Sequence, residues 1–389
     1  MKTIRVDVKP QGDRELKIVW NDDQPWPAYS IPRTAIDAAA RRIRRALAVM
    51  VDAALAGTLA TSADVVKDLA CAGSALYETL FAATDRGDVA RRVRSYYENA
   101  ESFRLRFSVE TSVFVPWGLV YPARTEEVEN LPLPADITKP GDYDRFWCLS
   151  RELATVYDRI PPDAVGRDFN SAGLGIMRVL HSEAFETATH QLGRAPEGQL
   201  LAWLDRAAPP ITTRKDLRHA WKTRGGTTGL LYFYCHANAT KLALSEEEKI
   251  ESAELLVTLS GAPRTPNTPS CLLMINGCST AVGDAKGDFM AAASQEGLCG
   301  FIGSETDVPD LFAMRFSLAL LNLLFREQLS VGSAMHRLYR RHFPLSLVYG
   351  LYAHPDFQMP QQGMPVYDEV ENLSIAAVGT GRLRARGWP

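Results

Sequence analysis

Alternating apolar and polar positions open the chain and then give way to helical spacing. The segments TIRVDVKP and RELKIVW alternate, which predicts a pair of strands that leads into a proline-rich turn at Trp26-Pro27. Apolar residues then recur at helical spacing, which predicts helices over residues 33–56 and 62–83. FRLRFSVE alternates like a half-buried strand, and SVFVPWGLVY resembles a second strand interrupted at Pro116, where proline favours an edge or a bulge.

The composition changes between residues 124 and 165. This stretch is acidic and rich in proline, which predicts loop structure with a short helix around residues 146–157. We therefore divide the chain into two parts. Residues 1–165 are expected to hold a β-hairpin and a helical region, with an insertion at about 124–165, and residues 166–389 an α/β region.

The second part alternates continuous apolar strands with helices. The predicted strands are GLGIMRVL, GLLYFYCHA, SCLLMING, LCGFIGS and a late LSLVYGLYA. The predicted helices are SEAFETATHQL, GQLLAWLDRA, RKDLRHAWKT, IESAELLVTL, GDFMAAASQEG and residues 312–326 and 332–341. Continuous apolar strands are typical of a mainly parallel sheet that helices cover on both faces, so the fold class is expected to be α/β.

Two of these predicted strands end in residues whose side chains can take part in catalysis. YFYCH ends in His236, and MINGC ends in Cys278. In open α/β sheets functional groups gather beyond the carboxyl ends of the strands, so on neighbouring strands this pair would face one crevice. A free thiol has a pKa of about 8.5, and a nearby imidazolium lowers it so that the nucleophilic thiolate is populated. A lone cysteine on a strand is usually an inert buried residue, and a lone histidine is usually only hydrogen-bonded, so this alternative remains open.

A metal site and a phosphate loop are weaker interpretations. Cys235 and His236 are adjacent, so on a strand they point to opposite faces. Cys271 and Cys278 stand at the two ends of one strand, unlike a compact pair of zinc ligands. The glycine-rich RGGTTG precedes its strand, whereas a phosphate loop follows one. No metal and no cofactor are therefore expected.

Composition and charge indicate which partners and which cellular location to expect. The formal net charge is −3, which gives no electrostatic reason to expect a nucleic-acid partner. No window has the apolar length of a membrane span, and the start lacks the pattern of a signal peptide, so we expect a cytoplasmic protein that does not bind membranes. The cysteines at positions 71, 148, 235, 271, 278 and 299 show no disulfide framework and are expected to be reduced.

Several motifs together resemble a known family. VPWGLVY, YFYCHANAT, LMINGCSTA, GFIGSETDVPDLFAMRF and PLSLVYGLYAHPD occur in the order found in CHAT domains, which are caspase-like cysteine peptidases related to separases and caspases. The likeness runs from about residue 70 to the end of the chain. It implies a caspase-like three-layer α/β/α sandwich with a mostly parallel central sheet, and endopeptidase activity without a cofactor.

The resemblance assigns roles to individual residues. Cys278 matches the nucleophile and His236 the general base and acid. The oxyanion hole would be formed by two backbone N–H groups, those of Cys278 and Ala237. Ala237 departs from the family pattern, which usually has glycine after the histidine, because glycine suits a positive φ or a close approach of the substrate backbone.

The segment GSETDVPD resembles the part of separases in which acidic side chains hold a basic P1 residue. Asp307 and Asp310 match those positions, and Glu305 is a neighbour. Carboxylates at a pocket floor would bind arginine bidentately and lysine as a point charge. The alternative for Asp310 is that it caps the helix that begins at LFAMRF.

We therefore expect a cysteine endopeptidase that cleaves a protein substrate after a basic residue. Because no sensor module is recognisable, a regulatory or sensor protein would be supplied by another chain, in a bacterial stress or defence pathway. The alternative is a scaffold on a peptidase fold that has lost activity. The remaining histidines lie in predicted helical regions, directly after a helix, or after another strand, and we do not assign them to the site. They are His181, His190, His219, His336, His342 and His354.

Overall fold

The computed structural model describes ten stretches of the chain, and they fall into two compact units. The described residues are 2–22, 26–81, 87–98, 103–110, 115–157, 175–192, 209–261, 271–282, 289–293 and 298–359. The first unit comprises Met1–Asp158 and Tyr339–Leu347, and the second comprises Arg159–Leu338 and Val348–Pro389. The first unit therefore includes a segment that lies far away in the sequence.

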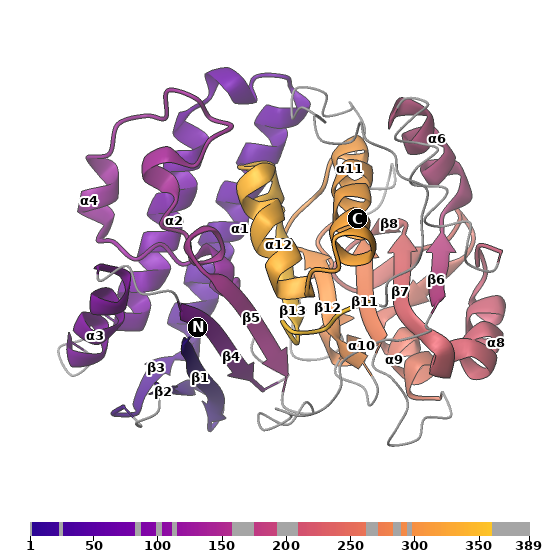
Figure 1. Cartoon of the computed structure of the whole chain (residues 1–389), viewed down its shortest axis with the longest axis horizontal. Helices are drawn as coiled ribbons and strands as arrows, with labels where there is room; N and C mark the ends of the chain where they lie inside the picture. Colours follow the sequence, from indigo (N-terminus) through magenta and orange to yellow (C-terminus); the bar gives the residue numbers. More distant parts are fainter. Residues whose placement is uncertain are drawn as a thin grey trace. The chain divides into compact units, whose positions relative to one another are not determined.

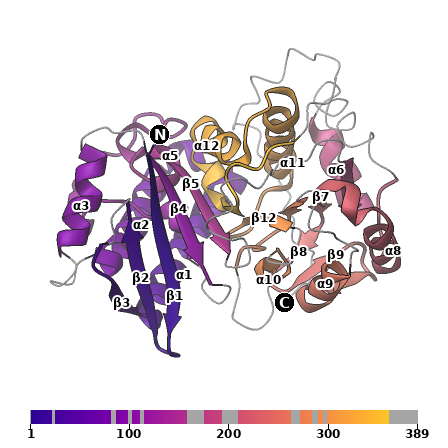
Figure 2. The same cartoon turned by 60° about the horizontal axis from the view of Figure 1, so that its bottom comes forward.

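A five-stranded sheet in the order β3-β2-β1-β4-β5 organises the first unit (Figure 2). Its strands are β1 (Lys2–Gln11), β2 (Glu15–Asn21), β3 (Tyr29–Pro32), β4 (Phe103–Val109) and β5 (Glu152–Tyr157). β1 pairs antiparallel with β2, which confirms the N-terminal pair of strands, and parallel with β4. The alternating residues of β1 explain the burial, because Ile4, Val6 and Val8 all point into the core.

Helices α1 (Arg33–Leu55) and α2 (Asp64–Phe81) pack against each other and lie behind this sheet in Figure 2. Both were predicted from helical spacing, and both are confirmed to within a few residues. Shorter helices follow at α3 (Gly87–Glu98), α4 (Thr125–Glu129) and α5 (Trp147–Ser150). Ser74 of α2 donates a hydrogen bond to the Ala123 carbonyl (2.6 Å), which fastens the loop that precedes α4 to α2.

Two expectations for this unit are wrong. SVFVPWGLVY is not a strand where it is described, because Pro116 lacks an N–H and Trp117–Leu119 forms a 3-10 turn. Trp117 is instead a buried core residue that stacks on Phe107, with ring centroids 4.5 Å apart. The helix expected over residues 146–157 ends at Ser150, and the rest of the segment is β5, since its backbone pairs with β4.

The second unit is built on a five-stranded sheet in the order β13-β12-β11-β7-β6 (Figure 1). Its strands are β6 (Gly175–Leu180), β7 (Thr228–Tyr234), β11 (Cys271–Asn276), β12 (Leu298–Ser304) and β13 (Tyr349–Ala353). β6, β7, β11 and β12 pair in parallel, and β13 pairs antiparallel with β12. The predicted α/β class with a mainly parallel sheet is therefore confirmed.

Helices cover this sheet on both faces. The helices are α6 (Ser182–Leu192), α8 (Arg214–Arg224), α9 (Ser252–Ser260), α10 (Phe289–Ala293), α11 (Asp310–Leu321) and α12 (Val331–Arg341). α6 and α11 pack against each other, and α8 and α10 each pack against α9 (Figures 1 and 2). Tyr232 of β7 reaches α11, where its hydroxyl lies 3.1 Å from that of Ser317.

Some boundaries in this unit differ from the expected ones. GLLYFYCHA is not one strand, because β7 ends at Tyr234 and His236–Ala237 forms β8 in a separate sheet of order β10-β9-β8. The late strand covers only β13, since Leu345–Val348 is a 3-10 turn. The expected helix GQLLAWLDRA lies outside the described residues. Within the described part of the chain, no helix has the length and apolar character needed to cross a membrane.

Candidate active site

Four parallel strands end at one edge of the sheet in the second unit. Because β6, β7, β11 and β12 run in the same direction, the residues that follow them gather along that edge. The residues that follow these strands and carry polar or reactive groups are His181, His236, Cys278, Glu305 and Asp307. This edge is the candidate active site.

The strands that lead to His236 and Cys278, β7 and β11, are direct neighbours. Tyr234, at the end of β7, pairs with Asn276, at the end of β11. The Cys235 N–H extends this pairing by donating to the Asn276 carbonyl (3.4 Å). His236 and Cys278 are each two residues beyond the paired positions, so both leave the sheet at the same level. The prediction that these two strands are adjacent is confirmed.

Gly277 allows the two strand ends to touch. A Cβ atom at Gly277 would lie 2.6 Å from the Ala237 Cβ and 2.9 Å from the Cys235 carbonyl oxygen. Real Cβ atoms do not approach other atoms so closely, so only glycine fits here without movement of a strand end. The residue before the candidate nucleophile therefore packs on the residue after the candidate base.

The Cys278 thiol is enclosed by the segment that follows β12. Only 1% of this residue is exposed. The Val308 N–H points at the sulfur (3.4 Å), and the thiol donates to the Val308 carbonyl at 4.0 Å. The Cys278 sulfur therefore lies buried against the Val308 backbone.

The turn after Cys278 is tied to the end of β12. Ser279 has a φ of 54°, a left-handed conformation that is uncommon for residues other than glycine. Its N–H donates to the Thr306 carbonyl (2.9 Å), and Thr280 Oγ1 accepts the Ser304 N–H (3.0 Å). Unfavourable backbone conformations persist only where their surroundings enforce them, and here the contacts with Ser304 and Thr306 do so.

A buried polar network lies beneath this turn. The Asn276 amide nitrogen donates to Ser317 Oγ (2.8 Å) and to the Ala313 carbonyl (3.0 Å) of α11. Its oxygen accepts the Tyr349 hydroxyl (2.6 Å). Burial raises the pKa of Tyr349 well above its ordinary value and that of Tyr232 to about 12, so both hydroxyls stay neutral donors at physiological pH. The network fixes the end of β11 against α11.

His236 and Ala237 form β8, the edge strand of the small sheet. β9 (Lys241–Ala243) pairs with β8, with Ala237 opposite Leu242. The Asn238 N–H donates to the Lys241 carbonyl (3.0 Å). In an antiparallel pair the bonded positions alternate, so the Ala237 N–H points away from β9. The Asn238 side chain accepts the Lys241 N–H (2.9 Å) and closes the turn.

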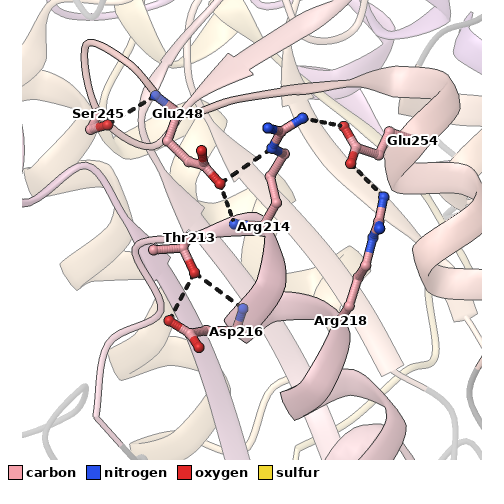
Figure 3. Close-up of polar contacts among 7 residues, drawn as sticks. All are labelled: Thr213, Arg214, Asp216, Arg218, Ser245, Glu248 and Glu254. Atoms are coloured by element: carbon pink, nitrogen blue, oxygen red, sulfur yellow. Dashed lines mark hydrogen bonds and ion pairs between the residues drawn. The ribbon is translucent and has the colours of Figure 1, made fainter.

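An ionic network joins the hairpin of β9 and β10 (Lys249–Glu251) to two helices (Figure 3). Arg214 donates through its backbone N–H (2.9 Å) and its Nε (3.2 Å) to Glu248 in the β9–β10 turn. Its N–H lowers the pKa of the Glu248 carboxyl. Glu254 of α9 accepts from Arg218 (2.6 Å) and lies 3.5 Å from Arg214. This network holds the hairpin that continues from His236 against α8 and α9.

His181 is a site residue that the sequence analysis set aside. It directly follows β6, and its ring lies against that of His236, with centroids 4.9 Å apart and planes at 72°. Its N–H donates to the Tyr234 carbonyl (2.8 Å). Burial, together with the charge of His236, lowers the pKa of His181. The available signal was its position immediately after an apolar strand, the same signal that identified His236.

The three predicted carboxylates have different surroundings. Asp307 accepts a hydrogen bond from the Ser279 hydroxyl (3.5 Å), so it reaches the turn that follows Cys278. Asp310 is the first residue of α11, and its carboxylate accepts the Leu311 N–H (2.7 Å). Glu305 is 2% exposed, and its own N–H donates to the Val348 carbonyl (2.7 Å). Asp307 is the carboxylate that contacts the residue beside Cys278.

The remaining candidates fall outside the site. None of the six cysteines, all of which lie among the described residues, forms a disulfide bond, and burial raises the pKa of Cys235 and Cys148 well above the ordinary thiol value. Cys271 lies fully buried at the start of β11, at the opposite end from Cys278. Across the residues that the structure describes, no three histidine, cysteine or acidic side chains are grouped to hold a metal ion.

No model of a known protein family matches the sequence, and a search of curated proteins finds no relative either. The resemblance to CHAT domains therefore depends on the quoted motifs alone.

Proposed function

We propose that this chain is a caspase-like cysteine endopeptidase in which Cys278 is the nucleophile and His236 the general base and acid. The observation that carries this proposal is the pairing of Tyr234 with Asn276, which brings the two reactive residues out of the sheet at the same level. A thiol and an imidazole on adjacent strand ends are the two groups that nucleophilic catalysis by cysteine uses. The resemblance to CHAT domains names the same two residues.

The reaction would follow the usual course of acyl transfer to a thiolate. Cys278 Sγ, deprotonated by His236, attacks the scissile carbonyl carbon and forms a tetrahedral oxyanion. The oxyanion collapses, the C–N bond breaks, and the His236 imidazolium gives its proton to the leaving amine. Water then attacks the thioester while His236 takes the water proton. The second product leaves as a carboxylic acid, and the thiol is regenerated.

Two backbone N–H groups are candidates for the oxyanion hole, those of Cys278 and Ala237. The Ala237 N–H points away from β9, so it does not take part in the hydrogen bonds between β8 and β9. The methyl group of Ala237, where the family usually has glycine, lies against Gly277. The absent side chain at Gly277 thus makes room for the methyl group, which supports a working oxyanion hole despite the departure from the family pattern.

We propose that the substrate is a protein cleaved after arginine or lysine. Asp307 is the main determinant of this preference, because its carboxylate contacts Ser279, the residue next to the nucleophile. Asp310 and Glu305 contribute negative charge from the same segment. A carboxylate beside the site would attract a basic side chain more strongly than a neutral one.

We also propose that another protein activates the enzyme, in a bacterial stress or defence pathway. The thiol is 1% exposed and contacts the Val308 backbone, so a substrate carbonyl reaches the sulfur only after this segment moves. A partner that displaces the segment around Val308 would provide such a movement. The proposed function involves neither a membrane nor a nucleic acid as a partner.

The enclosed thiol also favours a second candidate function, an inactive scaffold on the same fold. In that case the Val308 contact is a permanent part of the core and Cys278 is a packing residue. The two candidates differ in whether an electrophile with a basic residue can reach Cys278.

The test combines a P1-scanned peptide library with an arginine-containing acyloxymethyl ketone, each applied to wild type, Cys278→Ala and Cys271→Ala. Cys271 is the matched control because it is a buried thiol at the other end of the same strand. We expect slow covalent labelling and basal cleavage in wild type and Cys271→Ala, from the minor population in which the segment around Val308 has moved without a partner, and neither in Cys278→Ala. A wild-type protein that neither cleaves any peptide nor labels at Cys278 contradicts the peptidase and supports the scaffold.

A further inference from the structure

We infer that His181 is a positioning residue for His236, held as a neutral imidazole with its proton on Nε2, and that it is not a second base. Its effect on catalysis rests on the proposed peptidase function, whereas its tautomer and its contact with His236 do not. The inference concerns a residue that the family resemblance does not assign to the site.

The first observation fixes the tautomer. His181 precedes α6, and its Nδ1 accepts the N–H of Ala184 in the first turn of that helix (3.3 Å). A neutral imidazole has one nitrogen that accepts and one that donates, so the proton of a neutral ring must lie on Nε2. Protonation of Nδ1 would remove the acceptor that the helix terminus uses, so the structure favours the neutral ring.

The second observation concerns the charges around this ring. Besides His236 of β8, the charged groups that act on it are Glu183 of α6 and Glu246 of the β9–β10 turn. Both carboxylates are exposed and favour a charged ring, but burial and the charge of His236 outweigh them and lower the pKa of His181. Burial and the charge of His236 thus disfavour a charged His181 ring, and the proposed mechanism assigns the transferred proton to His236.

The third observation is the rigidity of the contact. The backbone of His181 is fixed to the end of β7, because its N–H donates to the Tyr234 carbonyl (2.8 Å). The preceding residue, Leu180, donates to the Ile211 carbonyl (3.0 Å). The ring thus meets His236 in a T-shaped arrangement that both backbones hold in place, with centroids 4.9 Å apart. Such a contact limits the orientations open to the half-buried His236 ring.

Two substitutions separate the ring contact from the helix cap. His181→Phe keeps a flat ring beside His236 and removes the acceptor for the Ala184 N–H. His181→Asn keeps a side-chain oxygen suited to capping α6 and removes the ring. We expect kcat/KM to change by less than about 3-fold in His181→Phe and to fall by about 10- to 100-fold in His181→Asn, mainly through kcat. Tm should fall in His181→Phe and stay near wild type in His181→Asn.

A structural role in capping alone gives the opposite pattern, with His181→Asn fully active, and would overturn the inference. Equal losses of activity in both variants would also overturn it, because they indicate a proton-transfer role for the nitrogen. A second readout, the imidazole 15N–1H NMR spectrum at neutral pH, does not depend on turnover. We expect an unprotonated His181 Nδ1, and His236 signals that shift in His181→Asn but not in His181→Phe.

The NMR readout keeps the two hypotheses distinguishable. A wild-type protein without Cys278-dependent cleavage or labelling contradicts the peptidase, yet the predicted His181 tautomer and the variant-specific shifts of His236 would still support the positioning contact. A charged His181 ring at neutral pH, or His236 signals that are the same in wild type and His181→Asn, contradicts the contact whether or not the protein cleaves peptides.

Discussion

Gly277 and Ala237 meet so closely that a single methyl group added to Gly277 would lie 2.6 Å from the Ala237 Cβ. This contact joins the strand end that carries Cys278 to the one that carries His236. Because the Cys235 carbonyl is also within 2.9 Å of the added atom, the backbone itself would have to move. The spacing between the strand ends that lead to Cys278 and His236 therefore depends on a residue without a side chain.

Gly277→Ala should separate the two strand ends. We expect a loss of stability of about 1–3 kcal/mol from overpacking, and a fall in kcat/KM of about 100-fold because the reacting groups are displaced. Urea unfolding and peptide cleavage measure the two effects. Gly261→Ala is the matched control, since a Cβ there meets its nearest atom at an ordinary 3.6 Å. Wild-type kcat/KM in Gly277→Ala would show that the contact does not set the site.

Tyr349→Phe should weaken the buried network beneath Cys278. The substitution keeps the ring, which stacks on Phe316 with centroids 3.9 Å apart, and removes the hydroxyl that donates to Asn276. We expect a loss of about 1–3 kcal/mol in the free energy of unfolding, because the buried Asn276 oxygen loses a donor. An unchanged urea midpoint would mean that Asn276 finds another donor in the variant.

Stability should depend on pH through His181. Its pKa is lowered in the folded protein from the ordinary 6.5, so on acidification the unfolded chain takes up a proton before the folded one does. The free energy of unfolding is therefore undiminished above about pH 6.5 and falls as the pH drops from there toward the lowered folded value. His181→Asn removes this contribution.

The difference between wild type and His181→Asn reports the His181 ring together with its charge coupling to His236. We expect the loss of stability between about pH 7.5 and about pH 5.5, measured by urea unfolding, to be larger in wild type. A larger loss in His181→Asn would indicate that the folded state binds the His181 proton more tightly than the unfolded chain does.

Asp307→Asn and Asp310→Asn should have separate effects. Asp307 contacts the turn after Cys278, so its substitution should lower kcat/KM for arginine at P1 by about 10-fold or more and leave neutral P1 residues nearly unaffected. The asparagine in Asp310→Asn would still accept the Leu311 N–H, so this substitution removes only a negative charge from the first turn of α11 and should cost about 0.3–1 kcal/mol of stability. Equal losses of P1 preference in both variants would place both carboxylates in the pocket.

The local pattern of apolar and polar residues was sufficient to predict many of the helices and strands. The apolar runs of β7 and β11 and the helical spacing of α1 and α2 are visible in the sequence, because burial of one face imposes a period on nearby residues. It failed where pairing with a distant segment decides the structure. Residues 152–157 became β5 through pairing with β4, and the residues around Trp117 became a turn.

The sequence by itself also showed that His236 and Cys278 follow apolar strands; His181 has the same position, and the motifs that resemble CHAT domains selected the pair. Only the tertiary structure decided which of these residues meet. It brought His181 against His236, gave Asp307 and Asp310 different hydrogen-bond partners, and placed Gly277 on Ala237. The physical reason is that strand order and register arise from contacts between segments far apart in the chain, and a periodic pattern records only which side of each segment is buried.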